Sequence, residues 1–474
     1  MVLNYHTFLG LFFFSVLLFT QRALGQAVDK PIPSNQRIHG YKGIWFELNQ
    51  KHPPYGDKYS GGLGTYTAKH IPLAIYSEQA GKTFFVYGGT SLPEETHLLC
   101  MIGYYDHKRR VVPEPTVVYD KMGVNDPHDN PSLLIDPEGY LWVFVSGRGN
   151  IRPGYKFRSS HPFTIDHFEQ ITKEEMTYPQ PWYIYGMGMI HLFTKYTGIR
   201  ELYFETSSDG IQWSDDVKLA GIIAPGDSLG GHYQVSNRYG NKISTFFNRH
   251  PEGHPDKRTD LYYLQTTDFG KTWTTVQGDT VKLPVTKVDH ESIVTNYQML
   301  NKNVYVKDLN FDPAGNPVCL YVTSRGHEPG PGNAPYEWRI TKWNGKEWQT
   351  AVICTSDHNY DMGSLYIKKR KWKVIAPTIG LPKRYATGGE IVIRKSSDQG
   401  KTWKIDKQVT RNSQHNHAYI RRPVDARDPF YFLWADGDPH RLSKSFLYYG
   451  NSKGKYWQLP YETNSPFTRP VRAK

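Results

Sequence analysis

Short runs of apolar and aromatic residues alternate with polar turns along almost the whole chain. In residues 132–145, SLLIDPEGYLWVFV, two apolar runs flank an Asp-Pro-Glu-Gly turn. Runs of about four to eight β-branched and aromatic residues, separated by Gly, Pro, Asn and Asp, predict β-strands. Helical spacing is almost absent, and residues 171–176, ITKEEM, are the one short helix-like segment. The pattern predicts an all-β fold.

A repeated motif identifies the kind of all-β fold. TTDFGKTW (266–273) and SSDQGKTW (396–403) match the Asp box S/T-x-D-x-G-x-T-W in full, and SSDGIQW (207–213) matches it one residue short. WNGKEW (343–348) and NSKGKYW (451–457) keep only the Gly and the Trp. In such a box Asp and Ser/Thr bind backbone N–H groups, Gly takes a positive φ and Trp packs between sheets. The boxes predict a β-propeller, and their spacing predicts seven blades, with six or eight as alternatives.

Four segments share a second pattern, in which a polar cluster is followed by a strand, a turn and an aromatic-rich strand. They are residues 127–149, 306–326, 358–377 and 415–437. The first strand of each propeller blade lines the central channel. We therefore expect the polar openings of several blades to converge on one axis.

The N-terminal residues read as a targeting segment. Residues 9–20, LGLFFFSVLLFT, form an apolar run that is short for a membrane span, and Ala23-Leu24-Gly25 follows as a small-x-small cleavage site. We expect a signal peptide over residues 1–25, a single propeller domain over 26–474, no membrane span and a secreted or periplasmic location. The three cysteines show no metal-ligand spacing, and we expect them to be buried free thiols.

Charge and aromatic content narrow the choice of partner. The chain carries 57 Lys and Arg against 45 Asp and Glu, a net charge of +12, and 14% of its residues are aromatic. A basic, aromatic surface on a secreted protein favours an acidic polysaccharide or oligosaccharide, although excess charge also serves solubility alone. Basic helices, RNA-binding aromatic signatures and zinc fingers are missing from the sequence, so nucleic acid is not expected. We expect a monomer.

Histidines at the openings of the innermost strands have two readings. Each is expected to hydrogen-bond its neighbours around the channel, and several together offer an alternative, a structural metal ion in the channel. No cofactor is otherwise expected. These histidines are His70, His232, His290, His358, His415 and His417.

Five residues of the early blades suit one reaction. They are His107, His128, Tyr183, Arg200 and Tyr233. In β-elimination from a uronic acid, an Arg neutralises the carboxylate so that the C5 proton becomes acidic. A His or Tyr removes that proton, and another protonates the leaving oxygen at C4. We predict that these five are catalytic.

A second group is expected to bind the substrate around the catalytic residues. Its members are Arg148, His191, His232 and His358. Arg148 and Arg325 end equivalent strands in two of the repeats, which favours a structural part in their roles as well.

The sequence resembles the secreted seven-bladed propellers that act on rhamnose–glucuronate linkages. The resemblance covers nearly all of residues 26–474 and rests on YKGIWFELNQ (41–50), YGDKYSGGLGTYTAKH (55–70), HLLCMIGYYDHK (97–108), DPHDNPS (126–132), VSGRG (145–149), MTYPQPWY (176–183), GHYQVSN (231–237) and TGGEI (387–391). More distantly, the chain is similar to the propeller ulvan lyases, which use two His, a Tyr pair and an Arg.

That resemblance assigns roles residue by residue. His107 and His128 match the two histidines, and Arg200 matches the arginine that neutralises the carboxylate. Tyr183 and Tyr233 match the tyrosine pair, with Tyr178 and Tyr185 as rivals of Tyr183. Some relatives are rhamnosidases with a catalytic His on the opposite propeller face, at the end of the GIWF motif; this chain carries Gln50 there, which disfavours hydrolysis.

The leading reading is a carbon–oxygen lyase that performs β-elimination at a hexuronate of an acidic, rhamnose-containing glycan such as ulvan. An oligosaccharide dehydratase would expel water with the same residues. A glycoside hydrolase, such as an exo-acting α-L-rhamnosidase or an enzyme with two carboxylates, is the second enzyme class. A carbohydrate-binding propeller is the alternative without catalysis.

Overall fold

The computed structural model describes residues 34–473 apart from residues 68, 94–96, 125 and 198–199. The expected signal peptide lies outside the described residues. The described residues are dominated by β-strands and contain four short 3-10 helices: η1 (Leu63–Thr65), η2 (Pro127–Asp129), η3 (Pro251–Gly253) and η4 (Pro331–Asn333). Among them, no helix has the length and apolar character that crossing a membrane requires.

Seven antiparallel sheets of four or more strands follow one another along the described chain. The first three are β4 (Ala74–Ser77), β5 (Lys82–Gly89), β6 (Leu99–Asp106) and β8 (Thr116–Asp120), with β1 (Gln36–Arg37) at the edge; β9 (Pro131–Ile135), β10 (Leu141–Val145), β11 (Gly154–Ser159) and β12 (Phe168–Glu174); and β13 (Thr177–Ile184), β14 (Gly188–Lys195), β15 (Glu201–Ser207) and β16 (Val217–Ala220).

The other four large sheets repeat this order. They are β17 (Gln234–Tyr239), β18 (Lys242–Arg249), β19 (Thr259–Thr266), β20 (Trp273–Thr274), β21 (Thr280–Val281) and β22 (Ile293–Thr295); β23 (Asn303–Phe311), β24 (Pro317–Ser324), β25 (Tyr336–Trp343) and β26 (Trp348–Ser356); β27 (Ser364–Lys368), β28 (Lys371–Ile379), β29 (Glu390–Ser396) and β30 (Lys404–Gln408); and β31 (Asn416–Arg421), β32 (Phe432–Gly437), β34 (Leu447–Gly450), β35 (Tyr456–Gln458) and β37 (Val471–Arg472).

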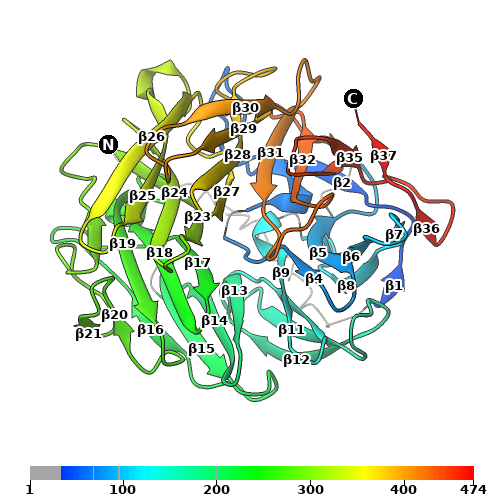
Figure 1. Ribbon diagram of the computed structural model, residues 1–474, viewed down its shortest axis with the longest axis horizontal. Helices are drawn as coiled ribbons and strands as arrows, with labels where there is room; N and C mark the ends of the chain where they lie inside the picture. The colour runs from blue at the N-terminus through cyan, green and yellow to red at the C-terminus, as the bar shows by residue number, and fades with distance from the viewer. Residues whose placement is uncertain (1–33, 68, 94–96, 125, 198–199, 474) are drawn as a thin grey trace, which may run out of the picture. The chain divides into compact units, whose positions relative to one another are not determined.

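The large sheets stand around a centre, with the first long strand of each nearest to it (Figure 1). This arrangement confirms the predicted all-β propeller. Two small sheets lie beside the seven large ones: β2 (Gly43–Phe46) with β3 (Gly61–Gly62) and β33 (Ser443–Ser445), and β7 (Val112–Pro113) with β36 (Phe467–Thr468). The number of blades stays a prediction.

Contacts between the two ends of the described chain close the ring. Strand β2 pairs with β33, and β7 pairs with β36, so early and late segments share hydrogen bonds. One apolar core joins Phe85 of β5 to Phe430, Leu433 and Leu447 of the last large sheet. Burial of such side chains removes apolar area from water and stabilises the closed ring.

The Asp boxes have the local structure that their sequence predicts. In the box at 266–273, the Thr266 hydroxyl and the Thr272 N–H both donate to Asp268 Oδ1, each at 2.9 Å. The Gly270 N–H donates to Thr266 Oγ1 at 3.0 Å, and Gly270 takes a φ of +83°. Trp273 is buried. The second full box repeats the backbone contacts.

Two expectations need comment. The helix-like segment 171–176 was predicted wrongly, because residues 168–174 form the edge strand β12 and pair with β11. Pairing with an existing sheet supplies the backbone partners and overrides a weak helix propensity.

The cysteines are free, as expected; Cys100 and Cys319 are buried, whereas Cys354 is partly exposed.

Candidate active site

The innermost strands have two ends, which lie on two sides of the propeller. We call the side where they begin, marked by His128 before β9 and Tyr178 in β13, the start side. The side where they finish, marked by Ile135 of β9 and Tyr183 of β13, is the end side. Aromatic rings and cations gather on the start side, and we call this group the tyrosine–arginine cluster. Its members are His128, Arg148, Tyr178, Tyr196, Arg200, Tyr233, His250 and Arg258.

A row of four rings forms the spine of the cluster. The centres of the His128 and Tyr178 rings are 5.6 Å apart, those of Tyr178 and Tyr233 are 5.5 Å apart, and those of Tyr233 and His250 are 4.6 Å apart. These residues come from the openings of three successive large sheets and from the loop after β18. The fold therefore brings together four groups that can exchange protons.

Guanidinium groups surround Tyr233. The Arg200 guanidinium carbon lies 5.8 Å from the centre of the Tyr233 ring, and that of Arg258 lies 4.4 Å from it. Arg200 Nε and Nη1 are buried and have no hydrogen-bond partner in the part of the chain that the structure describes. A buried donor without a partner is costly, which points to an anionic ligand at this position.

The pKa values of the two tyrosines move in opposite directions. Burial raises the pKa of Tyr233, but the charges of Arg200, Arg258 and Arg148 lower it by more than burial raises it. The pKa of Tyr233 therefore lies below the usual value of tyrosine. Burial raises the pKa of Tyr178 well above that value, and the neighbouring Tyr233 contributes to the rise. Environments that separate the pKa values of two such groups suit one group to act as a base and the other to act as an acid.

His250 is a neutral imidazole in this setting. Burial lowers its pKa well below the usual value, and the charges of Arg200 and Arg258 lower it further. Both of its ring nitrogens are buried without a hydrogen-bond partner among the described residues. His250 therefore has two free positions for a ligand beside Tyr233.

A carboxylate fixes His128 and Arg148. The Nδ1 atom of His128 hydrogen-bonds Asp126, and Arg148 Nη1 and Arg152 Nη2 donate to the other oxygen of Asp126 at 2.6 and 2.7 Å. Burial raises the pKa of Asp126, but the contact with His128 and the charges of Arg148 and Arg152 lower it overall, so the group is a carboxylate. The Arg148 side chain is 36% exposed and lies over the Tyr196 ring, and Tyr233 is 7% exposed.

The structure brings together four of the predicted site residues and leaves two predicted catalytic residues elsewhere. His128, Arg148, Arg200 and Tyr233 belong to the cluster. His107 instead hydrogen-bonds the Thr83 hydroxyl near the beginning of β5, at 2.8 Å. Its neighbour Tyr76 lines a cleft on the end side.

Tyr183 lines the same end-side cleft and lies five residues along β13 from Tyr178. At a rise of about 3.3 Å per residue, this separation is roughly 16 Å. The rival Tyr178, and not Tyr183, therefore pairs with Tyr233.

The remaining predicted substrate-binding histidines are held inside the protein. His191 Nδ1 hydrogen-bonds Glu205 at 2.7 Å within β14 and β15. His232 bonds the Asn248 carbonyl and accepts from the Ile222 N–H, both at 2.9 Å, so its nitrogens are occupied. His358 is buried and accepts from the Tyr360 N–H at 3.1 Å. None of these three lies in the cluster, and the backbone and carboxylate partners explain their positions.

Sequence reasoning missed His250, Arg258 and Tyr196. His250 follows β18 and Arg258 precedes β19, so neither lies at the opening of an innermost strand. The run FFNRH (246–250) mirrors FVSGR (144–148), since in each a basic residue lies at or shortly after the end of a second strand. That parallel was the one available signal.

The position of Gln50 differs from what the resemblance implied. Its N–H donates to Asp57 at 2.8 Å, and its carbonyl accepts from the Lys58 N–H at 3.1 Å. The Lys58 ammonium donates to Tyr305 at 3.3 Å, and Arg258 lies over the Tyr305 ring. Gln50 therefore lies on the start side, not on the face opposite the cluster.

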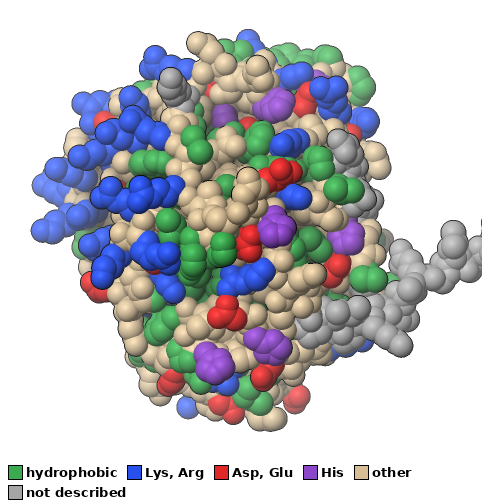
Figure 2. Space-filling view, turned by 90° about the vertical axis from the view of Figure 1, so that its right-hand side faces the viewer, with side chains coloured by type: hydrophobic (Ala, Val, Ile, Leu, Met, Phe, Trp, Pro, Cys, Tyr) green, Lys and Arg blue, Asp and Glu red, His purple; other side chains and the backbone are tan. Residues whose placement is uncertain are grey.

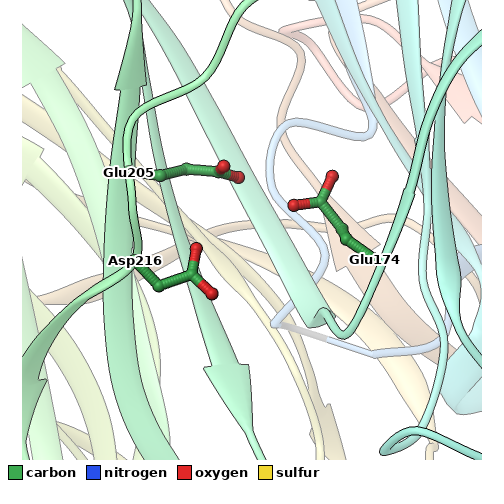
Figure 3. A group of neighbouring side chains, drawn as sticks. All are labelled: Glu174, Glu205 and Asp216. Atoms are coloured by element: carbon green, nitrogen blue, oxygen red, sulfur yellow. The ribbon is translucent and has the colours of Figure 1, made fainter.

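One group of carboxylates has the spacing of a metal site. Ligand atoms of Glu174, Glu205 and Asp216 lie within 4.8 Å of one another (Figure 3). The Lys156 ammonium already bonds Glu174 at 2.7 Å and Glu205 at 2.8 Å. A lysine thus supplies the positive charge that these acids require, and we assign the group to structure.

Comparisons with known proteins agree with the fold. An ulvan lyase of Alteromonas sp. (strain LOR) is 24% identical over 262 residues, which are 47% of this chain and 52% of that protein. An ulvan lyase of Nonlabens ulvanivorans is 24% identical over 279 residues, 50% of this chain and 57% of that protein. The matches thus span about half the length of these curated relatives.

A solved PL25 ulvan lyase, bound to -[GlcA(1-4)Rha3S]-, has the same fold. It is 16% identical, has a TM-score of 0.68, and the alignment covers 93% of this chain and 98% of that one. The polysaccharide lyase Uly1 is 12% identical with a TM-score of 0.59, covering 90% and 99%. A family described as BNR repeat-containing matches residues 101–355. Because this match covers more than half of the 474 residues, the chain belongs to the BNR repeat-containing family.

Proposed function

We propose that this protein is a carbon–oxygen lyase that performs β-elimination at a hexuronate of an acidic, rhamnose-containing glycan such as ulvan. The product is a 4,5-unsaturated uronate. The observation that carries the proposal is the pair of unpartnered, buried Arg200 nitrogens beside a tyrosine of lowered pKa. The ulvan lyase names of the sequence relatives and the net charge of +12 support an acidic glycan.

Arg200 binds the C5 carboxylate of the uronate and spreads its negative charge. This interaction lowers the energy of the enolate-like state that forms when the C5 proton leaves. Arg148 and the neutral His250 line the same position and hydrogen-bond the sugar. The guanidinium suits this role because it holds a carboxylate through two parallel hydrogen bonds.

Tyr233 acts as the base and Tyr178 as the acid. The Tyr233 phenolate takes the C5 proton, the C5–H electron pair forms the C4=C5 double bond, and the C4–O bond breaks. The departing oxygen takes the proton of Tyr178, which has the raised pKa. After the product leaves, the proton on Tyr233 passes to Tyr178, which restores both tyrosines; His128, fixed by Asp126, lies beside Tyr178. Chain groups supply every proton and charge, so the proposal gives no step to a cofactor.

The cleft on the end side is the competing location. Its volume of about 790 Å³ lies within the range that is typical of ligand-binding pockets. Burial raises the pKa of its Tyr183, and nearby acids raise it further, which is unfavourable for a base. We therefore assign the chemistry to the cluster.

The first test is turnover of ulvan oligosaccharides, followed by ultraviolet absorbance of the conjugated C4=C5 bond. We expect Tyr233→Phe to lose about 10²–10⁴-fold in kcat, because it keeps the packing ring and removes the base. Tyr183→Phe is the matched control and keeps its activity on short substrates. Arg200→Ala should also abolish turnover, and Arg411→Ala, at an exposed position, should not. Normal turnover by Tyr233→Phe would refute the assignment.

Product mass separates the alternatives. Two fragments indicate a lyase, and loss of one water from an intact oligomer indicates the dehydratase. Fragments without the absorbing double bond would indicate an α-L-rhamnosidase or another hydrolase. Two carboxylates that a hydrolase could use are already engaged: Asp129 with Lys121 and Arg152, and Glu390 with Ser413. Secretion, a monomeric state and the single domain remain part of the proposal.

A further inference from the structure

The cleft on the end side lies at the opposite ends of the same strands that carry the cluster. Residues from six of the seven large sheets line it, together with the loop that follows β31 of the seventh, because the innermost strands end there. β9 begins beside His128 and ends at Ile135 on the cleft wall, and β13 carries Tyr178 at one end and Tyr183 at the other. The separation of roughly 16 Å along β13 prevents one short sugar from filling both places.

Two aromatic rings in the cleft each lie beside a guanidinium group. Tyr185 is 66% exposed, and the Arg238 guanidinium carbon lies 5.4 Å from its ring centre. The Arg427 guanidinium lies 5.8 Å from the ring centre of Tyr76. Such rings offer flat apolar faces for sugar rings, and the guanidinium groups beside them bind carboxylate or sulfate.

The cleft wall continues this pattern around Tyr366. Tyr366 and Tyr431 stack at 4.5 Å, and the Arg422 guanidinium lies 6.0 Å from the Tyr366 ring centre. Arg422 is tied to Asp308 at 3.3 Å, so this part of the wall is held in place. This part of the cleft wall is therefore formed by side chains whose positions are fixed by their neighbours.

Three acids and three arginines line the cleft, and the excess of positive charge lies just beyond it. Glu78 and Asp425 are exposed on its lining, and Asp136 is occupied by the Trp142 indole and the Tyr140 N–H, both at 2.8 Å. Next to the lining residue Ile367, the four consecutive cations of residues 368–371 (KKRK) are exposed. An anionic chain leaving the cleft would meet this basic turn.

A further lysine joins the basic turn through the backbone. The Gln399 N–H donates to the Arg370 carbonyl at 3.4 Å, and the Lys342 ammonium donates to the Gln399 carbonyl at 3.0 Å. Figure 2 shows that Lys and Arg side chains crowd one edge of the face in view and are sparser on the rest of it. On the face in view, the positive charge is therefore unevenly distributed.

We propose that the end-side cleft is a second, non-catalytic site that binds a uronate- or sulfate-bearing saccharide chain. The proposal rests on the proposed function for the choice of ulvan as the probe. One propeller then holds a polymer on the end side while the cluster acts on a chain on the start side. Engagement of two sites raises the effective concentration of polymer at the protein.

The test is affinity electrophoresis of the full chain in native gels that contain ulvan. We expect Tyr185→Ala/Arg427→Ala to bind ulvan at least about tenfold more weakly than the wild type, while its kcat and KM on a short oligosaccharide stay unchanged. Arg411→Ala removes one exposed charge away from the cleft and should bind as the wild type. Gels with desulfated ulvan show whether sulfate or uronate supplies the anion.

Unchanged retardation of the double variant would overturn the proposal, and so would equal weakening by Arg411→Ala, which would indicate net charge alone. Arg200→Ala separates this proposal from the catalytic one, because it should lose turnover and keep binding. If the wild type turns over no uronate glycan while the double variant still loses binding, the catalytic proposal fails and the cleft stands.

Discussion

Arg258→Met tests whether guanidinium charge makes Tyr233 a base. The Arg258 guanidinium carbon lies 4.4 Å from the Tyr233 ring centre, and the side chain is buried. Met keeps most of the aliphatic volume and removes the charge. Arg200 stays in place to bind the substrate carboxylate, so KM should change little.

The size of the effect follows from the distance. At an effective dielectric constant of ~20, unit charges at that distance attract by about 4 kcal/mol. Because a phenolate spreads its charge from the ring to the oxygen, we take about half, ~2 kcal/mol, which is about thirtyfold in phenolate population. The variant should lose about that factor in kcat/KM at pH values below the pKa of Tyr233.

The sign of the pH dependence is specific. Loss of a neighbouring cation raises the pKa of Tyr233, so the rise of kcat/KM with pH should move to higher pH, and activity should recover in alkali. The assay is the absorbance of the unsaturated product across pH, with Arg411→Met as the charge control and thermal melting as the check on folding. A profile with the wild-type pH dependence would refute the reasoning.

Three further outcomes are expected. Tyr178→Phe should lower kcat more than it raises KM, because it removes the proton for the leaving oxygen; substrates with a more acidic leaving group should be rescued in steady-state assays, and uniform loss would contradict this. Gly270→Ala should lower the Tm and destabilise by about 1–3 kcal/mol, because φ is +83° and a Cβ would meet Phe204 at 2.6 Å; an unchanged Tm would show that the box tolerates it. Burial raises the pKa of Asp361 to about 8, so the folded carboxyl keeps a proton that the unfolded chain loses near the usual aspartate pKa of 3.8. The contribution of Asp361 to stability therefore falls as pH rises between these values, and Asp361→Asn should gain Tm relative to the wild type at pH above 8; parallel pH curves would refute it.

The sequence was informative where structure is local. Each Asp box closes on itself through Asp268 or Asp398 and its own turn, so the motif could be recognised without knowledge of the fold. His128 follows the same logic, because Asp126 two residues earlier caps η2 and holds its ring.

The tyrosine pair shows where this reasoning stops. Tyr178 has a φ of +57°, and the pairing of β13 with β14 shifts register between Thr177 and Gln180. Simple alternation of side chains along a strand does not hold there, so the sequence pattern offered no reason to prefer Tyr178 to Tyr183. The motif around His107 likewise gives no sign of which end of β5 this residue joins, and the structure places it beside Thr83, outside the cluster.

The chain pattern by itself determined the all-β class, the propeller and the polar openings of the innermost strands, because these depend on contacts within a few residues or on a period of two. Only the tertiary structure decided which strand ends meet and how β2–β33 and β7–β36 close the ring. It also decided that three arginines surround Tyr233. Desolvation and Coulomb energy depend on distances in space, and those distances join residues that lie far apart in the chain.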